Sequence, residues 1–244
     1  MKILRLGIHV LRALARTGPD HPVPRDVQNW CLDFFRHLNI RVRHHGCLPD
    51  PSRGPCLIVS NHVSWLDPVA ISSIHPASFV SKAEVSRIPV LGHLARRGGT
   101  VFLDRSSFRS LGTVFRKMEK LLEGGKSVAL FPEGKTTSGL EVLSFASALF
   151  EPACRTGVPV LPVAIRYTRN NGKELALSAA FAEGQSFFSS FANILGEKSL
   201  EVTLSWTDPV FPERFSRRDL AECSESRIKA ILGSWRMSGN ASSG

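Results

Sequence analysis

A histidine and an aspartate follow a short apolar run and have the residue types of a catalytic base and its orienting carboxylate. The run covers residues 56–60, and His62 and Asp67 stand five positions apart just after it. In open α/β sheets, ligands bind at the carboxyl ends of strands. A histidine there can take a proton from a hydroxyl, and a carboxylate on its other ring nitrogen fixes the tautomer. The sequence contains no Gly-x-Ser-x-Gly motif, so we expect the activated hydroxyl to belong to a substrate.

The spacing of His62 and Asp67 restricts the local fold. Within one helix, side chains five positions apart point about 140° away from each other. The two meet only if His62 precedes a helix whose first turn contains Asp67. Ser64-x-x-Asp67 has the form of a capping box with Ser64 as N-cap, and Pro68 suits a first turn. A purely structural interpretation is the alternative, with Asp67 as a cap partner and His62 as a polar residue at a strand end.

Composition narrows the class of protein. The chain has 244 residues, 43% of them hydrophobic, which is enough for one sizeable core. Five cysteines without a Cys-x-x-Cys pair argue against a disulfide framework and against a cysteine zinc site, and they favour a reducing cytosolic location. A net charge of +10 suits nucleic acid or an anionic membrane surface. We expect no nucleic-acid partner, because neither zinc-finger spacing nor an aromatic-rich nucleic-acid motif is present.

The N-terminal region predicts contact with a membrane surface. No uncharged apolar stretch approaches the roughly 18 residues of a membrane span. Residues 2–16 predict a basic amphipathic helix, which is typical of an interfacial anchor; the alternative is a helix packed on the domain with a solvated basic face. A second apolar helical face follows over residues 27–38 and suits packing on the domain or insertion into lipid. We therefore predict a membrane-associating segment over 1–39, a main domain over 40–236 and a flexible tail over 237–244.

Predicted strands and helices alternate from residue 40 onward. This alternation predicts an α/β fold with right-handed crossovers: a mixed, largely parallel sheet flanked by helices. The predicted strands cover residues 40–44, 56–60, 78–80, 100–103, 128–131, 160–165 and 202–206. The predicted helices cover residues 65–74, 83–96, 108–122, 145–156 and 219–235.

Four short segments at predicted strand edges have unusual chemistry. They cover residues 61–68, 98–105, 130–139 and 158–165. The third contains Pro-Glu-Gly followed by a lysine and hydroxyl residues, and such a loop can offer backbone N–H groups and a cation to an anion. It also suits an ordinary turn. In the second, Arg105 can hold a phosphate or carboxylate through paired donors, or it can pair with Asp104.

Together, the four segments resemble the sequence blocks of the glycerolipid acyltransferase family, whose members acylate lysophosphatidate and related lysolipids. The order is His-x4-Asp at 62–67, Gly-x-x-Phe-aliphatic-Asp-Arg at 99–105, Phe-Pro-Glu-Gly at 131–134 and Val-Pro-x-x-Pro-Val-Ala at 158–164. Lys82-Ala83-Glu84 resembles the stretch that leads into the second block. The resemblance spans residues 40–210. It favours a catalytic role for His62 and Asp67 over the alternative in which they only cap a helix and end a strand.

The resemblance implies an α/β acyltransferase that uses acyl-CoA or acyl-ACP as co-substrate and needs no metal or other cofactor. His62 would be the general base on the acceptor hydroxyl, oriented by Asp67, with no acyl-enzyme intermediate. Four further positions match those that the family uses for the acceptor, chiefly its phosphate, and one is linked to the acyl donor. The acceptor positions are Lys82, Arg105, Glu133 and Gly134, and the donor position is Pro162.

The third block departs from the family pattern. The family usually continues Glu-Gly-Thr-Arg-Ser, with the arginine on the acceptor's phosphate. This chain has Lys135 in place of the threonine and Thr136 in place of the arginine. A planar, two-pronged phosphate ligand is thereby lost. Either Lys135 supplies the charge from one residue earlier, or the acceptor is not a phosphate monoester. The pattern Pro-Glu-Gly-x-Thr-Thr resembles the branch that includes lyso-ornithine-lipid acyltransferases.

We therefore expect a 1-acylglycerol-3-phosphate O-acyltransferase of phospholipid biosynthesis. The first alternative is an O-acyltransferase for lyso-ornithine lipid or another lysolipid. An alternative of another class is a non-catalytic lipid-binding or acyl-carrier-binding protein. The expected partners are anionic membrane lipid and acyl-CoA or acyl carrier protein. The expected location is peripheral, on the cytoplasmic face of the inner (cell) membrane.

Overall fold

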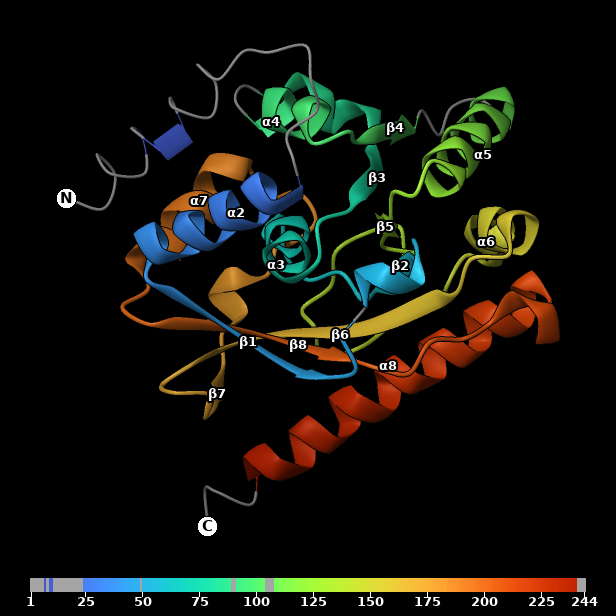
Figure 1. Ribbon diagram of the computed structural model, residues 1–244. Helices are drawn as coiled ribbons and strands as arrows, with labels where there is room; N and C mark the ends of the chain where they lie inside the picture. Colours follow the sequence, from blue (N-terminus) through green and yellow to red (C-terminus); the bar gives the residue numbers. More distant parts are fainter. Residues whose placement is uncertain are drawn as a thin grey trace.

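The computed structural model describes residues 7, 9–10, 24–48, 50–88, 91–103 and 108–240. Its centre is a mixed eight-stranded sheet in the order β1-β8-β6-β2-β5-β3-β4, with β7 paired to β6 (Figure 1). Each of the seven predicted strands is present, and the predicted α/β fold class is confirmed. The strands are β1 (Ile40–Gly46), β2 (Leu57–Ser60), β3 (Ser78–Lys82), β4 (Val101–Leu103), β5 (Val128–Leu130), β6 (Val160–Arg169), β7 (Glu174–Leu175) and β8 (Leu200–Trp206).

Strand direction divides the sheet into two parts. Five consecutive strands of the sheet run parallel to one another: β6, β2, β5, β3 and β4. Strand β8 pairs with β6 antiparallel, and β1 pairs with β8 in parallel. The carboxyl ends of five strands therefore meet at one edge, whereas β1 and β8 end at the opposite edge.

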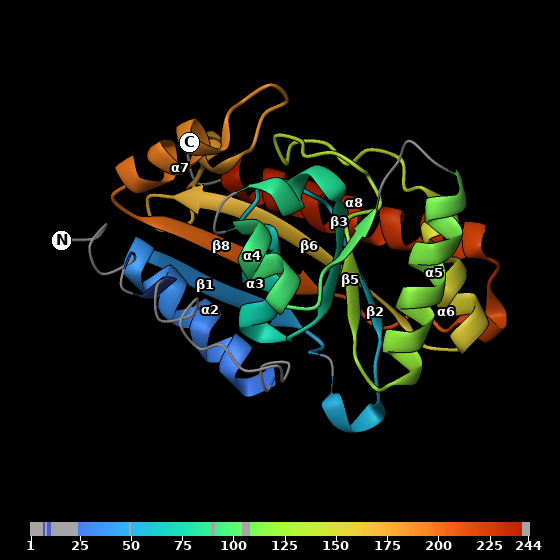
Figure 2. The same ribbon diagram turned by 90° about the horizontal axis from the view of Figure 1, so that it is seen from above.

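Helices cover both faces of the sheet (Figures 1 and 2). On one face, α2, α3 and α7 bury their apolar residues against one side of the sheet. On the other face, α5, α6 and α8 form a second core. From residue 24 onward, the α-helices of the described residues are α2 (Pro24–Leu38), α3 (Asp67–Ile74), α4 (Leu91–Arg97), α5 (Phe108–Glu123), α6 (Glu151–Thr156), α7 (Phe187–Gly196) and α8 (Arg217–Asn240).

The central strands have apolar residues toward both cores. Ile58 of β2 belongs to the core under α2 and α3, whereas Leu57 and Val59 belong to the core under α5 and α8. All four residues of β2 are buried. A strand that is covered on both faces has an almost continuous run of apolar residues in its sequence, and residues 56–60 have this pattern. This buried strand ends at Ser60, two residues before His62.

Prolines interrupt two of the predicted helices. The prediction of one helix over 83–96 was wrong: a 3₁₀ turn, η2 (Ala83–Arg87), comes first, and α4 begins at Leu91. Ile88 precedes a proline and is extended (φ −71°, ψ 120°), as the steric clash with a following proline ring requires. The helix predicted over 145–156 is likewise a 3₁₀ turn, η3 (Ser147–Phe150), followed by α6 with Pro152 near its start.

Two elements had not been predicted, and one helix is longer than expected. Strand β7 and helix α7 both lie in the chain between the predicted strands at 160–165 and 202–206. Helix α8 continues to Asn240, past the predicted boundary at residue 236 and into the predicted tail, of which residues 241–244 lie outside the described ranges.

Helix α2 is part of the domain core. Phe34, Phe35 and Leu38 are buried with the sheet residues of that face. Of residues 2–16, the described ones are Gly7, His9 and Val10, so most of the predicted basic helix lies outside the described ranges. The His9 ring stacks on Trp30 of α2 with 5.1 Å between centroids. Among the described helices, none has the length and hydropathy needed to cross a bilayer.

The burial of Phe35 predicts that α2 contributes strongly to stability. Phe35→Ala is expected to lower the free energy of unfolding by about 3–5 kcal/mol, because it leaves a cavity in a packed core. Phe188→Ala is the matched control: its side chain is 74% exposed, and a change within about 0.5 kcal/mol is expected. Urea denaturation followed by circular dichroism measures both. Equal, small effects would show that α2 is peripheral to the fold.

Candidate active site

Two of the four predicted segments, and Lys82 from the stretch before the second one, meet at the carboxyl edge of the parallel strands. His62 follows β2, Glu133 follows β5, and Lys82 ends β3. These strands are neighbours in the order β2-β5-β3 and run in the same direction. Figure 2 looks down on these strands from above. The sheet therefore brings residues from three distant parts of the sequence to one side of the molecule.

His62 and Asp67 are in direct contact. Nδ1 of His62 lies 2.7 Å from Oδ2 of Asp67, whose side chain is fully buried, whereas the His62 side chain is 21% exposed. Asp67 is the first residue of α3 and His62 lies ahead of the helix, which is the arrangement that their spacing required. A carboxylate at Nδ1 fixes the proton on that nitrogen. Nε2 then carries the lone pair that can accept a proton.

The prediction of Ser64 as N-cap was wrong. Helix α3 has Leu66 at its N-cap position, with no capping side chain. Half of the capping box is nevertheless present, because Oδ2 of Asp67 accepts from the backbone N–H of Ser64 at 2.9 Å. The hydroxyl of Ser64 is buried and has no hydrogen-bond partner among the described residues. The turn is therefore shaped around the aspartate and not around the serine.

Tyr167 holds the second oxygen of Asp67, a role that the sequence analysis missed. Tyr167 lies in β6, 100 positions after Asp67 in the chain. Its hydroxyl donates to Oδ1 of Asp67 at 2.8 Å. Burial, together with Asp67 itself, raises the pKa of Tyr167 well above its ordinary value, so the phenol stays protonated and donates. The signal available in the sequence was a lone tyrosine within a strand of aliphatic residues.

Asn61 joins β2 to β6 just ahead of His62, and this role was also missed. Its side-chain amide donates to the carbonyl of Ile165 at 2.9 Å and accepts from the same residue's N–H at 2.8 Å. The side chain thus extends the pairing of the two strands after the backbone of β2 turns away. Asn61 and Tyr167 thus both fix the turn that contains His62 and Asp67 to β6.

Glu133 binds the backbone of the His62 turn. One carboxylate oxygen accepts from the N–H of His62 at 2.7 Å, and the other accepts from the N–H of Leu143 at 2.8 Å. Burial raises the pKa of Glu133 above its ordinary value, although the two N–H donors act in the opposite direction. Phe131 stacks on the His62 ring with 4.0 Å between centroids. These contacts make Glu133 and Phe131 supports of the base.

The loop after Glu133 is tied to the chain on both sides. Gly134 has a φ of 75°, a conformation that glycine adopts without strain, in the turn that closes on Phe131. The hydroxyl of Thr136 donates to the carbonyl of Phe181. The N–H of Thr137 donates to the carbonyl of His62 at 2.8 Å. Lys135 is exposed and lies 3.9 Å from a carboxylate oxygen of Glu183.

The remaining predicted site residues lie in different surroundings. Lys82 is exposed at the end of β3. Pro162 is buried within β6, beside Val59 in the interior of the sheet, so it does not lie at the carboxyl edge with His62. Arg105 lies outside the described residues. Among the described residues, no cluster of three His, Cys, Asp or Glu side chains could hold a metal ion.

The hydrogen bonds of Asp67 predict that Tyr167 contributes to stability. Tyr167→Phe is expected to lower the free energy of unfolding by about 1.5–3 kcal/mol, the range for a hydrogen bond to a charged group. Ser64→Ala, in the same turn, is the control and should cause no comparable loss, because its hydroxyl makes no bond. Urea unfolding curves give the free energy of unfolding of each variant for comparison with the wild type. The assignment fails if Tyr167→Phe is as stable as the wild type.

Comparisons with known proteins agree with this geometry. Residues 40–166, just over half of the chain, match the family model described as Acyltransferase. A 1-acyl-sn-glycerol-3-phosphate acyltransferase of Neisseria gonorrhoeae is 44% identical over 120 residues, which cover 49% of this chain and 47% of that protein. The chain thus matches about half the length of that relative.

Other relatives match more of the chain. A lyso-ornithine lipid O-acyltransferase of Pseudomonas aeruginosa is 32% identical over 203 residues, 83% of this chain and 76% of that protein. Its counterpart from Brucella abortus is 36% identical over 216 residues, 82% and 77% of the two chains. The crystal structure of PlsC from Thermotoga maritima shares the fold, with a TM-score of 0.68 and 24% identity over 94% of this chain and 88% of that one. The chain belongs to the Acyltransferase family.

Proposed function

We propose that this protein transfers an acyl chain from a thioester to the hydroxyl of a lysolipid. The observation that carries this proposal is the contact between His62 and Asp67, with the base partly exposed at the carboxyl edge of β2. General-base catalysis requires a histidine whose second nitrogen is free to receive the proton, and a buried carboxylate at Nδ1 favours that tautomer. Family membership supports the reaction class.

The reaction is a direct transfer. Nε2 of His62 takes the proton of the acceptor hydroxyl while the acceptor oxygen bonds to the thioester carbonyl carbon. The carbon–sulfur bond then breaks, and the leaving thiolate receives the proton from the imidazolium. Asp67 stabilises the imidazolium in between. Each step is balanced with His62 and the two substrates alone, so we propose that the acyl thioester is a co-substrate and that no metal or other cofactor takes part.

For the acceptor we propose 1-acylglycerol-3-phosphate. The neisserial relative named for that activity has 44% identity in its aligned part. The exposed Lys82 and Lys135 place two cations on the same side as His62, and a phosphate monoester needs such charge. The acyl donor is acyl-CoA or acyl carrier protein.

Lyso-ornithine lipid is a second candidate, favoured by Thr136. This residue stands where the phosphate-binding arginine is usual, and its hydroxyl is occupied by the carbonyl of Phe181. Relatives named for lyso-ornithine lipid also match more than four fifths of this chain. An acceptor without a phosphate monoester has no need for a two-pronged ligand at this position.

Acyl transfer by the purified protein tests the function and separates the two acceptors. The wild type and His62→Ala are each offered lysophosphatidate and lyso-ornithine lipid with a labelled acyl thioester. We expect transfer to lysophosphatidate, reduced about 10²–10⁴-fold in the variant, the usual contribution of a general base. Transfer to lyso-ornithine lipid alone would establish the second candidate. A folded wild type that transfers to neither, or an unimpaired variant, would favour a non-catalytic lipid-binding protein.

We also propose that the protein is peripheral on the cytoplasmic face of the inner membrane and that its basic N-terminal segment contributes to binding. Deleting residues 1–17 is expected to weaken binding to anionic vesicles and to make the remaining binding less sensitive to salt, because four Lys and Arg residues are removed. Co-sedimentation at two salt concentrations measures this. Binding that is unchanged by the deletion would exclude an anchoring role for the segment.

A further inference from the structure

We propose that helix α7 is a second lipid-contacting element, which docks the catalytic edge on an anionic bilayer together with the cationic segment formed by η2 and α4. This inference rests on the proposed function, because the bilayer is the source of a lysolipid acceptor. It adds to the N-terminal segment a surface that is built into the domain itself. Three observations carry it: the exposed aromatic face of α7, the attachment of α7 to the catalytic turn, and the charge of the segment formed by η2 and α4.

Helix α7 is apolar and presents an aromatic side chain to solvent. Its ten residues contain no charged side chain and three phenylalanines. Phe188 is 74% exposed, the largest exposed fraction among the described large hydrophobic residues. Single exposed apolar residues are common on soluble proteins. Here the exposed ring is continuous with others: Phe187 packs against Phe188 at 5.9 Å and against Trp65 at 4.9 Å between centroids.

The aromatic cluster is attached to the turn that carries the base. Trp65 lies three residues after His62, and its indole N–H donates to the hydroxyl of Ser190 of α7 at 3.2 Å. The chain that leads into α7 is held by the same turn, since the N–H of Phe181 donates to the carbonyl of Val63 at 2.8 Å. An acyl chain that lies along these rings would therefore end close to His62.

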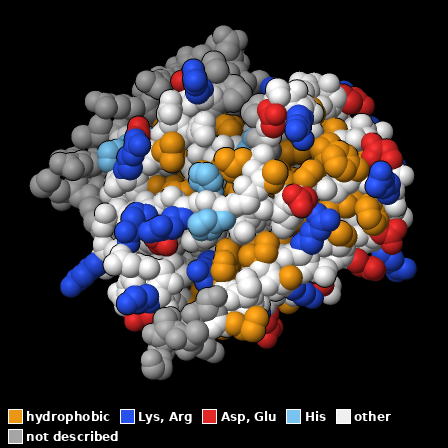
Figure 3. Space-filling view, turned by 60° about the horizontal axis from the view of Figure 1, so that its bottom comes forward, with side chains coloured by type: hydrophobic (Ala, Val, Ile, Leu, Met, Phe, Trp, Pro, Cys, Tyr) orange, Lys and Arg blue, Asp and Glu red, His pale blue; other side chains and the backbone are white. Residues whose placement is uncertain are grey.

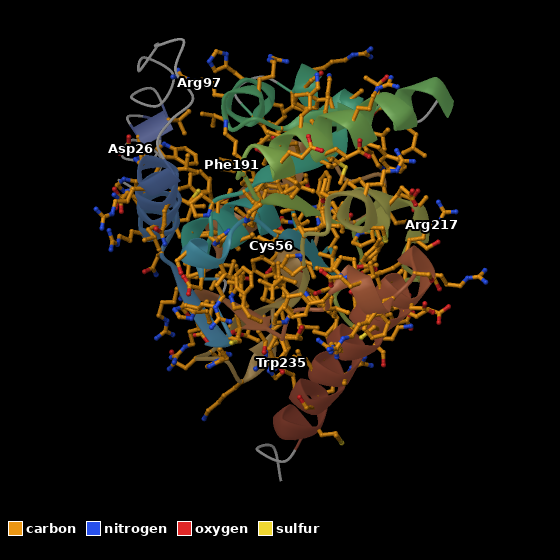
Figure 4. The ribbon with its side chains drawn as sticks, turned by 45° about the vertical axis from the view of Figure 1, so that its right-hand side comes forward. Asp26, Cys56, Arg97, Phe191, Arg217 and Trp235 are labelled. Atoms are coloured by element: carbon orange, nitrogen blue, oxygen red, sulfur yellow. The ribbon has the colours of Figure 1, made fainter. Side chains whose placement is uncertain are left out.

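The segment formed by η2 and α4 supplies positive charge on the same side of the molecule. Residues 82–97 contain one lysine and three arginines against a single glutamate, a net charge of +3. In Figure 4, Phe191 of α7 and Arg97 of α4 lie on one side of the molecule and Trp235 of α8 on the other. Figure 1 likewise places α4 and α7 opposite α8. Each basic residue near an anionic bilayer strengthens binding several-fold.

This combination fits a bilayer. An uncharged helix with one exposed aromatic ring and two half-buried ones suits the boundary between headgroups and acyl chains, and the cations on the same side of the molecule suit anionic headgroups. Figure 3 brings the bottom of the view in Figure 1 forward, where apolar groups stand beside both basic and acidic side chains. The bilayer thus lies on the α4 and α7 side.

Vesicle binding by the full-length chain tests the proposal. Phe188→Ser is compared with Phe211→Ser, a phenylalanine that is 50% exposed and lies after β8, next to Val210 of the core under α5 and α8. Vesicles contain phosphatidylglycerol and phosphatidylcholine, with pure phosphatidylcholine as the neutral reference. We expect Phe188→Ser to weaken binding about tenfold, as the loss of one inserted aromatic side chain implies. We expect Phe211→Ser to bind within about twofold of the wild type. Arg87→Gln should weaken binding to anionic vesicles and not to neutral ones.

Two results would overturn the proposal. One is a Phe188→Ser variant that binds vesicles as tightly as the wild type; the other is an equal loss in Phe211→Ser, which would show that any exposed phenylalanine has this effect. Neither of these vesicle-binding results depends on acyl transfer. A wild type without transferase activity whose vesicle binding still requires Phe188 would refute the proposed function and support the lipid-contacting surface.

Discussion

The buried carboxylate of Asp67 is the interaction on which the catalytic turn depends. Its oxygens accept from the N–H groups of Val63 and Ser64, from the ring of His62 and from the hydroxyl of Tyr167. A charge in a fully buried position is tolerated only when hydrogen-bond donors surround it. The turn, the start of α3 and the orientation of the base are therefore consequences of satisfying one anion.

Much of this arrangement was predictable from local pattern. The buried run at 56–60 gives a strand, Pro68 requires a first helical turn, and the spacing of His62 and Asp67 then requires their contact. Tyr167 and Asn61 were missed because their partners are about 100 positions away. No periodicity within a segment reports on such pairing, since it arises only when β6 is placed beside β2.

Helix α7 and the broken helix at 83–97 show two further limits of local pattern. A short helix without charged residues lacks the charged stripe by which amphipathic helices are most easily recognised, and α7 has no charged residue at all. At 83–97 the apolar spacing suited one helix, but the backbone restriction before Pro89 prevailed. Pro162 shows a third limit. A residue can match a family block and still lie in the interior of the sheet, so the match alone does not place it at the site.

The backbone of His62 is held on both sides, by Glu133 at its N–H and by Thr137 at its carbonyl, while Asp67 holds its ring. The base is thus a fixed point that a substrate must approach. Lys135 and Thr136 make their side-chain contacts with the loop at 181–183 and not with this framework. Under the proposed function, headgroup preference and proton transfer would therefore rest on different side chains: substitutions of Lys135 and Thr136 can alter the acceptor surface and leave the hydrogen bonds that hold His62 in place, which gives the fold a route to diversify its acceptors.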